Sequence, residues 1–134
     1  WIKSFEIFGD FSFLQKLFGT GPDTYFYAFA PYFGELSKFG DTSTNAAHNE
    51  YLNYLITIGA AGLIAYLSVV GGTIARAVKK SFSNPLSIVC VSAVICYSVQ
   101  AVVNIAQPIT TPLFILFVAL TEAVSRSKTD STQL

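Results

Sequence analysis

Charged residues are scarce in this chain, making up 12% of its 134 residues. Soluble globular domains carry about 25%. The scarcity is also uneven, because residues 51–75 and 85–121 contain no Asp, Glu, Lys or Arg. Uncharged, predominantly apolar runs of this length are typical of membrane-spanning helices. The composition therefore argues against a soluble domain, and we predict an all-α, polytopic membrane helical bundle.

Methionine is absent, and no uninterrupted apolar core follows Lys3 as it would in a signal peptide. Three spans with one large loop could not easily bury their own polar groups. We therefore expect a C-terminal fragment of a longer polytopic protein, whose N-terminal helices would complete the bundle.

Cysteine and histidine are also rare: the chain has Cys90, Cys96 and a single histidine, His48. A separation of six residues turns the two cysteines about 240° apart on a helix, so they cannot easily pair. No spacing that combines them with His48 is typical of a metal site. We expect no metal ion and no cofactor.

The uncharged runs predict three transmembrane helices, at about residues 51–74, 85–106 and 108–124. Basic residues without acidic neighbours lie between the first two spans, and further basic residues follow the third: Arg76, Lys79, Lys80, Arg126 and Lys128. Short cytoplasmic segments carry such an excess of Lys and Arg. This predicts an extracytoplasmic region at 1–50 and a polar, disordered cytoplasmic tail at 125–134. We interpret the basic residues as determinants of topology rather than as a nucleic-acid site.

Aromatic residues dominate the start of the extracytoplasmic region. Trp1, Phe5 and Phe8 have the spacing of a helix face, and the rest of residues 1–18 is typical of a segment at the membrane interface. Pro22 to Ala30 is expected to form a short helix, followed by a loop over residues 31–44. Residues 1–50 are therefore expected to form an interfacial loop region that carries short helices.

His48 lies where the polar loop meets the first predicted span. Asn45 would cap that helix, placing His48 at the third helical position. Unpaired N–H groups and the helix dipole attract phosphate to such an end and disfavour imidazolium there. A neutral imidazole at the mouth of a membrane helix is a candidate for proton transfer. A helix-capping residue without chemistry is the alternative.

Three further groups of small or polar residues stand out. Gly59 and Gly62, with two alanines between them, would allow close helix contact. Gln100 and Asn104 in the second span are expected to face protein rather than lipid. Gly19 and Gly21 form a Gly-x-Gly turn, in which the backbone can approach a ligand closely, although a plain turn explains them equally well.

Three segments together resemble the O-antigen ligase and polysaccharide polymerase family of bacterial envelopes. They are GTGPDTY from Gly19, AHNEYLNYLITIGAAGLIAYL around His48-Asn49 and Gly59 to Leu63, and VVNIAQPITTPLFILFVAL with Asn104 and Pro108 to Phe114. The order and spacing of the segments match the family's pattern, and the resemblance covers about residues 1–124.

The resemblance implies a metal-independent glycosyltransferase in the bacterial cytoplasmic (inner) membrane. The donor would be a glycan linked to undecaprenyl diphosphate, and the acceptor a hydroxyl of a saccharide, lipid or protein. His48 matches the histidine that activates this hydroxyl in the family. Asn49, Glu50, Gly19 and Gly21 are the candidates for substrate binding. The family's arginines, which hold the diphosphate, would precede Trp1, so the fragment alone should be inactive.

A segment of a polytopic membrane transporter is the competing interpretation. It draws on Gln100, Asn104 and Gln107, which lie beside a proline at one helix end. Transporters usually place such groups near the bilayer midplane, whereas here they gather toward one interface.

Overall fold

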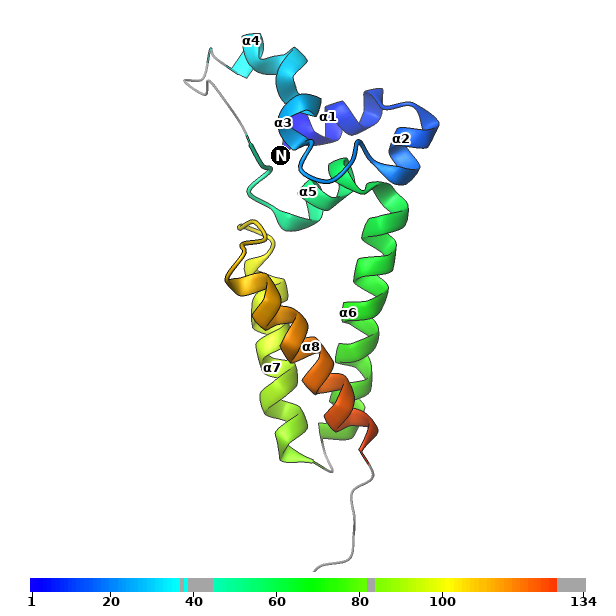
Figure 1. The fold of residues 1–134 in the computed structure, drawn as a ribbon, viewed down its shortest axis with the longest axis vertical. Coiled ribbons are helices and arrows are strands. Elements are labelled where there is room, and N and C mark those ends of the chain that lie inside the picture. Colours follow the sequence, from blue (N-terminus) through cyan, green and yellow to red (C-terminus); the bar gives the residue numbers. More distant parts are fainter. Residues whose placement is uncertain (37, 39–44, 82–83, 128–134) are drawn as a thin grey trace, which may run out of the picture. The chain divides into compact units, whose positions relative to one another are not determined.

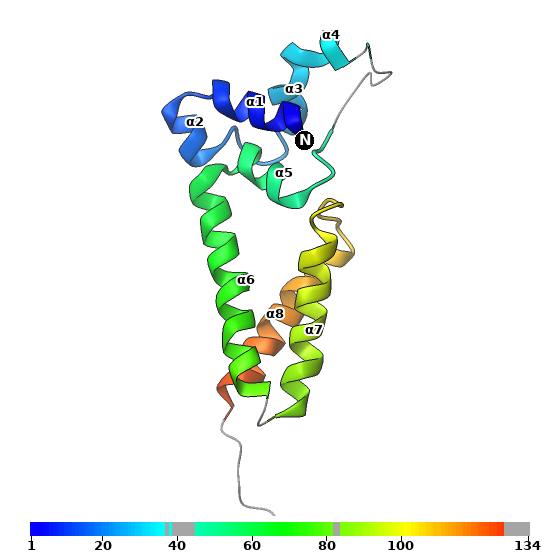
Figure 2. The same ribbon diagram turned by 180° about the vertical axis from the view of Figure 1, so that it is seen from behind.

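The computed structural model describes residues 1–36, 38, 45–81 and 84–127. The predicted all-α class is confirmed: the structure is 77% helical and has no strand among the described residues (Figures 1 and 2). The helices are α1 (Ile2–Asp10), α2 (Phe13–Phe18), α3 (Tyr25–Phe29), the 3-10 helix η1 (Ala30–Tyr32), α4 (Phe33–Leu36), α5 (Glu50–Thr57), α6 (Gly59–Ser81), α7 (Pro85–Gln100) and α8 (Thr110–Arg126).

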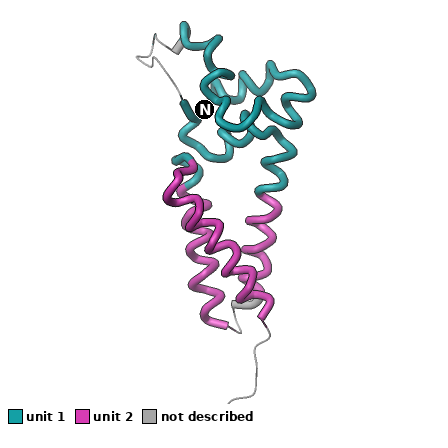
Figure 3. The backbone as a smooth tube through the Cα atoms, viewed as in Figure 1, with its two compact units in different colours: residues 1–66, 101–105 teal, residues 67–100, 106–134 magenta. Residues whose placement is uncertain are grey.

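The chain divides into two compact units (Figure 3). Unit 1 comprises residues 1–66 and 101–105, and unit 2 comprises residues 67–100 and 106–134. The division runs through α6, so the first turns of this helix belong to unit 1 and the remainder to unit 2.

Unit 1 is built around α5, against which α1, α2 and α3 pack. Its core follows helical spacing, because Leu52 and Ile56 on α5 and Tyr25 and Phe29 on α3 are each four residues apart. The buried core residues are Ile7, Tyr25, Phe29, Ala47, Leu52 and Ile56. Tyr25 and Phe29 stack with their ring centroids 4.5 Å apart.

The short helix predicted at Pro22–Ala30 begins later than expected. Asp23 has a φ of 57°, in the left-handed region, and α3 therefore starts at Tyr25. Its end was predicted more closely, because the α-helix stops at Phe29 and continues as the 3-10 turn of η1.

The first predicted span is not one continuous helix. α5 ends at Thr57, and α6 begins at Gly59, which has a φ of +71°. A side chain on Gly59 would collide with the Leu17 carbonyl of α2, so close backbone packing accounts for glycine here. The predicted close contact at Gly59 is therefore made with an upstream segment rather than with another membrane helix.

Unit 2 contains α7, α8 and most of α6, with α7 and α8 packed on each other. Tyr97 of α7 stacks on Phe114 of α8 with the ring centroids 4.1 Å apart. At the other end of α8, Glu122 pairs with Arg126 and with Arg76 of α6, whose Nη2 lies 2.9 Å from the carboxylate. The apolar stacking and this ion-pair group tie the unit together.

One described helix, Gly59–Lys79 within α6, is long and apolar enough to cross a membrane. α7 is apolar but has 16 residues and ends at Gln100, short of the predicted 106. At 1.5 Å per residue it would measure about 24 Å, against a hydrocarbon core of about 30 Å. α8 has 17 residues, beginning at Thr110 rather than at 108. Three transmembrane helices therefore remain a prediction.

Parts of two predicted segments lie outside the described residues. In the loop predicted at 31–44, residues 37 and 39–44 are not described, and residues 33–36 form α4. In the predicted disordered tail, residues 128–134 are not described. The start of that tail was placed too early, because α8 continues to Arg126.

Candidate functional site at the His48 turn

The His48 turn, defined here as residues 45–49, is anchored to unit 1 by Trp1. The indole Nε1 of Trp1 donates a hydrogen bond of 3.0 Å to the carbonyl of Ala47, and Ala47 is part of the buried core. The residue directly before His48 is thus fixed by both a hydrogen bond and apolar packing. The two partners are 46 positions apart in the sequence, which explains why no local sequence pattern indicates this contact.

Asn49, rather than Asn45, caps the following helix. Its side-chain oxygen accepts from the Leu52 backbone N–H at 3.0 Å, and its own backbone is extended. Asn45 lies exposed in the turn instead. The predicted cap was wrong because two asparagines four residues apart offer the same local signal, and tertiary anchoring at Ala47 selects the second.

His48 is consequently not the third residue of a helix. It precedes the cap, has a φ of 47° and is exposed. A non-glycine residue in the left-handed region is uncommon and indicates that its surroundings impose the conformation. The expected effect of the helix dipole at a third helical position therefore does not apply. What the fold provides is an accessible imidazole on a turn that is fixed on both sides.

Glu50 opens α5 and is buried, with 2% of its surface exposed. Its backbone N–H donates to the carbonyl of Ala101 at 2.8 Å, and its carboxylate accepts from the Tyr66 hydroxyl at 3.3 Å. Tyr51 and Tyr54 lie beside the Tyr66 ring, at centroid distances of 6.2 and 5.0 Å. Glu50 therefore ties the start of α5 to two distant segments of unit 1. Sequence reasoning missed Tyr66, which lies 16 residues away.

Gly19 and Gly21 lie at the opposite end of α5. The N–H groups of Thr20 and Gly21 donate to the carbonyls of Ile56 and Thr57 at 3.0 and 2.8 Å. These carbonyls end a helix and lack intrahelical partners, so the Gly-x-Gly turn satisfies them. A side chain on Gly19 would collide with the Thr57 carbonyl. Backbone packing thus accounts for this glycine.

The structure brings His48, Asn49 and Glu50 together but separates them from Gly19 and Gly21. The two groups are joined by α5, and the rise from Glu50 to Thr57 is about 10 Å. The five predicted site residues therefore form two clusters in unit 1, one at each end of the same short helix.

Lys3 is paired with two carboxylates. Its Nζ lies 2.6 Å from Glu6 and 2.7 Å from Glu35. Hydrogen bonds to Glu35 and Glu6 raise the pKa of Lys3, and the bond to Lys3 lowers the pKa of Glu35. The lysine charge is thus neutralised locally by carboxylates.

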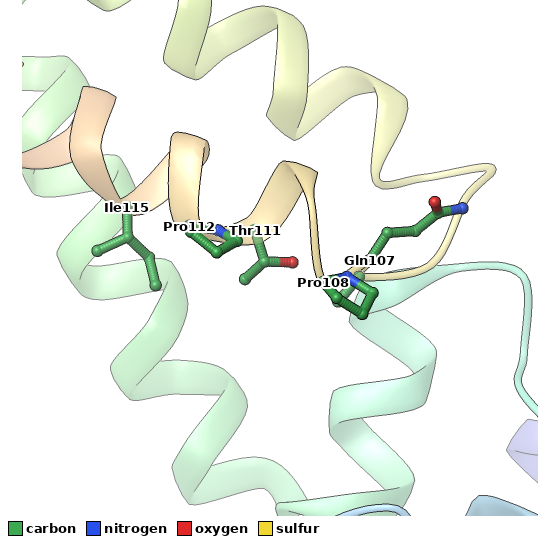
Figure 4. A pocket seen from close by; sticks show the side chains of 6 residues that line it. Gln107, Pro108, Thr111, Pro112 and Ile115 are labelled. Atoms are coloured by element: carbon green, nitrogen blue, oxygen red, sulfur yellow. The ribbon is translucent and has the colours of Figure 1, made fainter.

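Each unit has a hollow near polar side chains that the sequence singled out. One of about 300 Å³ in unit 1 is lined by Asp23, Phe26, Tyr27 and Asn45, the last of which belongs to the His48 turn. A larger hollow of about 530 Å³ in unit 2 runs along the start of α8, with Gln107, Pro108, Thr111, Pro112 and Ile115 on its wall (Figure 4). The second is mainly apolar.

In the described part of the chain, no group of three His, Cys, Asp or Glu side chains is placed so that it could hold a metal ion. Cys90 is buried and Cys96 exposed on α7, and both are free thiols. No protein-family model, curated protein or solved structure matches the sequence.

Proposed function

We propose that the protein takes part in transferring a glycan from an undecaprenyl-diphosphate-linked donor to an acceptor hydroxyl at the outer face of a bacterial cytoplasmic membrane. The observation that carries the proposal is the His48 turn. It presents an exposed imidazole between an anchored residue, Ala47, and a helix cap, Asn49.

The helices that follow the turn support a membrane setting. α6 is apolar over Gly59–Lys79, but only 17% of the window that defines this candidate span is buried. The core helix of a soluble protein is mostly buried. Large apolar side chains on α6 and α7 face outward, among them Ile64, Leu67, Val69, Val89 and Val99. A bilayer is the environment in which such surfaces are stable. The proposal places α6, α7 and α8 across it, with residues 1–50 outside.

The imidazole would act as a general base on the acceptor hydroxyl. As the hydroxyl oxygen attacks the anomeric carbon of the donor, His48 takes the hydroxyl proton. The bond between the anomeric carbon and the diphosphate oxygen breaks, and undecaprenyl diphosphate leaves with the electron pair. General-base assistance typically contributes about 10²–10⁴-fold to a rate. Positive groups elsewhere in the full-length protein would stabilise the leaving diphosphate.

The experiment compares product in cells that express full-length protein with His48→Asn or with the matched control Ala46→Ser. Asparagine tolerates a positive φ, so the first variant removes the base while preserving the turn. We expect His48→Asn to abolish polymer or ligated glycan at normal membrane levels, and Ala46→Ser to leave it unchanged. Unchanged product in His48→Asn would reject the base role.

A further inference from the structure

An apolar surface lies on α2, at the point within unit 1 where α2 contacts the start of α6. At 100° per residue, Phe13, Leu17, Leu14 and Phe18 fall within an arc of about 140° on this helix. Phe13, Leu14 and Phe18 are 78%, 66% and 63% exposed. We call these three residues with Leu17 the α2 apolar face.

The ends of α2 are fixed by specific contacts. Ser12 and Gln15 form a capping box at its start, with the Ser12 N–H donating to the Gln15 side chain at 3.0 Å. At its end, the Gly19 N–H donates to the Gln15 carbonyl at 2.7 Å. The apolar side chains therefore project outward from a helix whose two ends are both held by hydrogen bonds.

The position of α2 relative to the first turn of α6 points to what covers this face. The Leu17 carbonyl and the Gly19 N–H pack against Gly59, the first residue of α6 and of the candidate membrane span. Hence α2 is held at the level where α6 would enter the hydrocarbon. An apolar surface at this level meets the boundary between lipid headgroups and acyl chains.

The polar residues of α2 fit the same orientation. Around the helix axis, Lys16 lies about 60° outside the apolar arc on the Phe13 side. Gln15 lies about 60° outside it on the Phe18 side. A lysine that flanks an apolar face can extend its ammonium group to lipid phosphates while its stem stays in the apolar layer.

We infer that the α2 apolar face docks on the outer leaflet of the bilayer and holds unit 1 against it. The inference depends on the proposed function only in placing α6 across the membrane. The docking of unit 1 on lipid involves no further chemistry at His48.

The test uses full-length, cysteine-free protein in vesicles of phosphatidylethanolamine and phosphatidylglycerol. Nitroxide labels are placed singly at Leu14, Phe18, the control position Gln15 and the α6 reference Val69, which is 59% exposed. Relaxation by oxygen reports lipid, and relaxation by a water-soluble nickel chelate reports water. We expect labels at Leu14, Phe18 and Val69 to favour oxygen, and the label at Gln15 to favour nickel.

Two results would overturn the inference while leaving the α6 span intact. In one, Leu14 and Phe18 respond to nickel as Gln15 does, so the face is in water. In the other, they respond to neither reagent, so protein covers the face. A Val69 label that favours nickel would reject the span as well. Unchanged glycan transfer in His48→Asn would reject the proposed function and leave all four label readings as expected, so the two proposals fail separately.

Discussion

Gly19 shows that glycine can suit two roles, the lining of a ligand path and the close approach of two backbone segments. Its φ is +76°, and an added Cβ would overlap the Thr57 carbonyl. Left-handed backbone costs other residues about 1–2 kcal/mol, and overlap with rigid backbone adds to this. The sequence predicted a turn here, but its partner on α5 is almost 40 residues away.

Gly19→Ala is therefore expected to lower the melting temperature of the full-length protein in detergent. Gly9→Ala is the matched control, because no atom lies within 4 Å of the Cβ it would add to α1. Alanine is favoured over glycine by about 0.5–1 kcal/mol inside a helix, so the control should be neutral or stabilising. Equal melting temperatures of the two variants would contradict the close backbone contact between Gly19 and Thr57.

We expect the core of unit 1 to be sensitive to alkaline pH at Tyr25. Burial raises the pKa of Tyr25 to about 12, against the opposing effect of a hydrogen bond with Ser4 at 2.9 Å. Since the folded-state pKa exceeds the ordinary value of about 10, the stabilisation is complete below pH 10 and is lost as pH rises toward 12.

Tyr25→Phe should accordingly weaken the decline of stability between pH 10 and pH 12, although it loses the hydrogen bond at every pH. Thermal unfolding of both proteins across this range measures the difference in slope. Parallel curves would show that Tyr25 does not control the alkaline transition.

At the scale of elements, α5 is the part that the sequence described least well. Its uncharged, apolar run predicted one helix from 51 to 74, and the structure has a break between Thr57 and Gly59. Both ends of α5 are set by tertiary contacts, with Ala101 at its start and the Gly-x-Gly turn at its end. Local spacing predicts that a helix exists, but such distant hydrogen bonds decide where it begins and ends.

Substitutions at Asn49 distinguish a helix-capping role from direct substrate binding. Asparagine and aspartate cap helices equally well, whereas alanine costs about 0.5–2 kcal/mol. If Asn49 acts by fixing the His48 turn, Asn49→Ala should lower both melting temperature and glycan transfer, and Asn49→Asp should restore both. Normal stability with lost transfer in Asn49→Asp would instead assign the amide to substrate binding.

At the scale of the whole molecule, composition and charge predicted the helical class, and the structure confirms it. The positions of the candidate site residues were predicted only in part. The His48–Glu50 cluster could be found from sequence because its members are adjacent. Its anchors could not, since Trp1, Tyr66 and Ala101 reach it by contacts between distant segments.

The proposed topology places Asn45 outside and Lys79 in the cytoplasm. In intact cells, a membrane-impermeant maleimide should label Asn45→Cys in a cysteine-free background, and Lys79→Cys only after permeabilisation. Both positions are exposed in the structure. The reverse labelling pattern would place His48 on the face away from a lipid-linked donor and would contradict the proposed function.

The most direct test is the rate of glycan transfer by purified full-length protein with an undecaprenyl-diphosphate-linked donor in the presence of EDTA. We predict turnover that EDTA does not reduce, and a fall of about 10²–10⁴-fold in the rate of His48→Asn with the fold intact. The proposed mechanism would be contradicted if His48→Asn transferred glycan at the same rate as the unsubstituted protein, or if transfer required an added divalent metal.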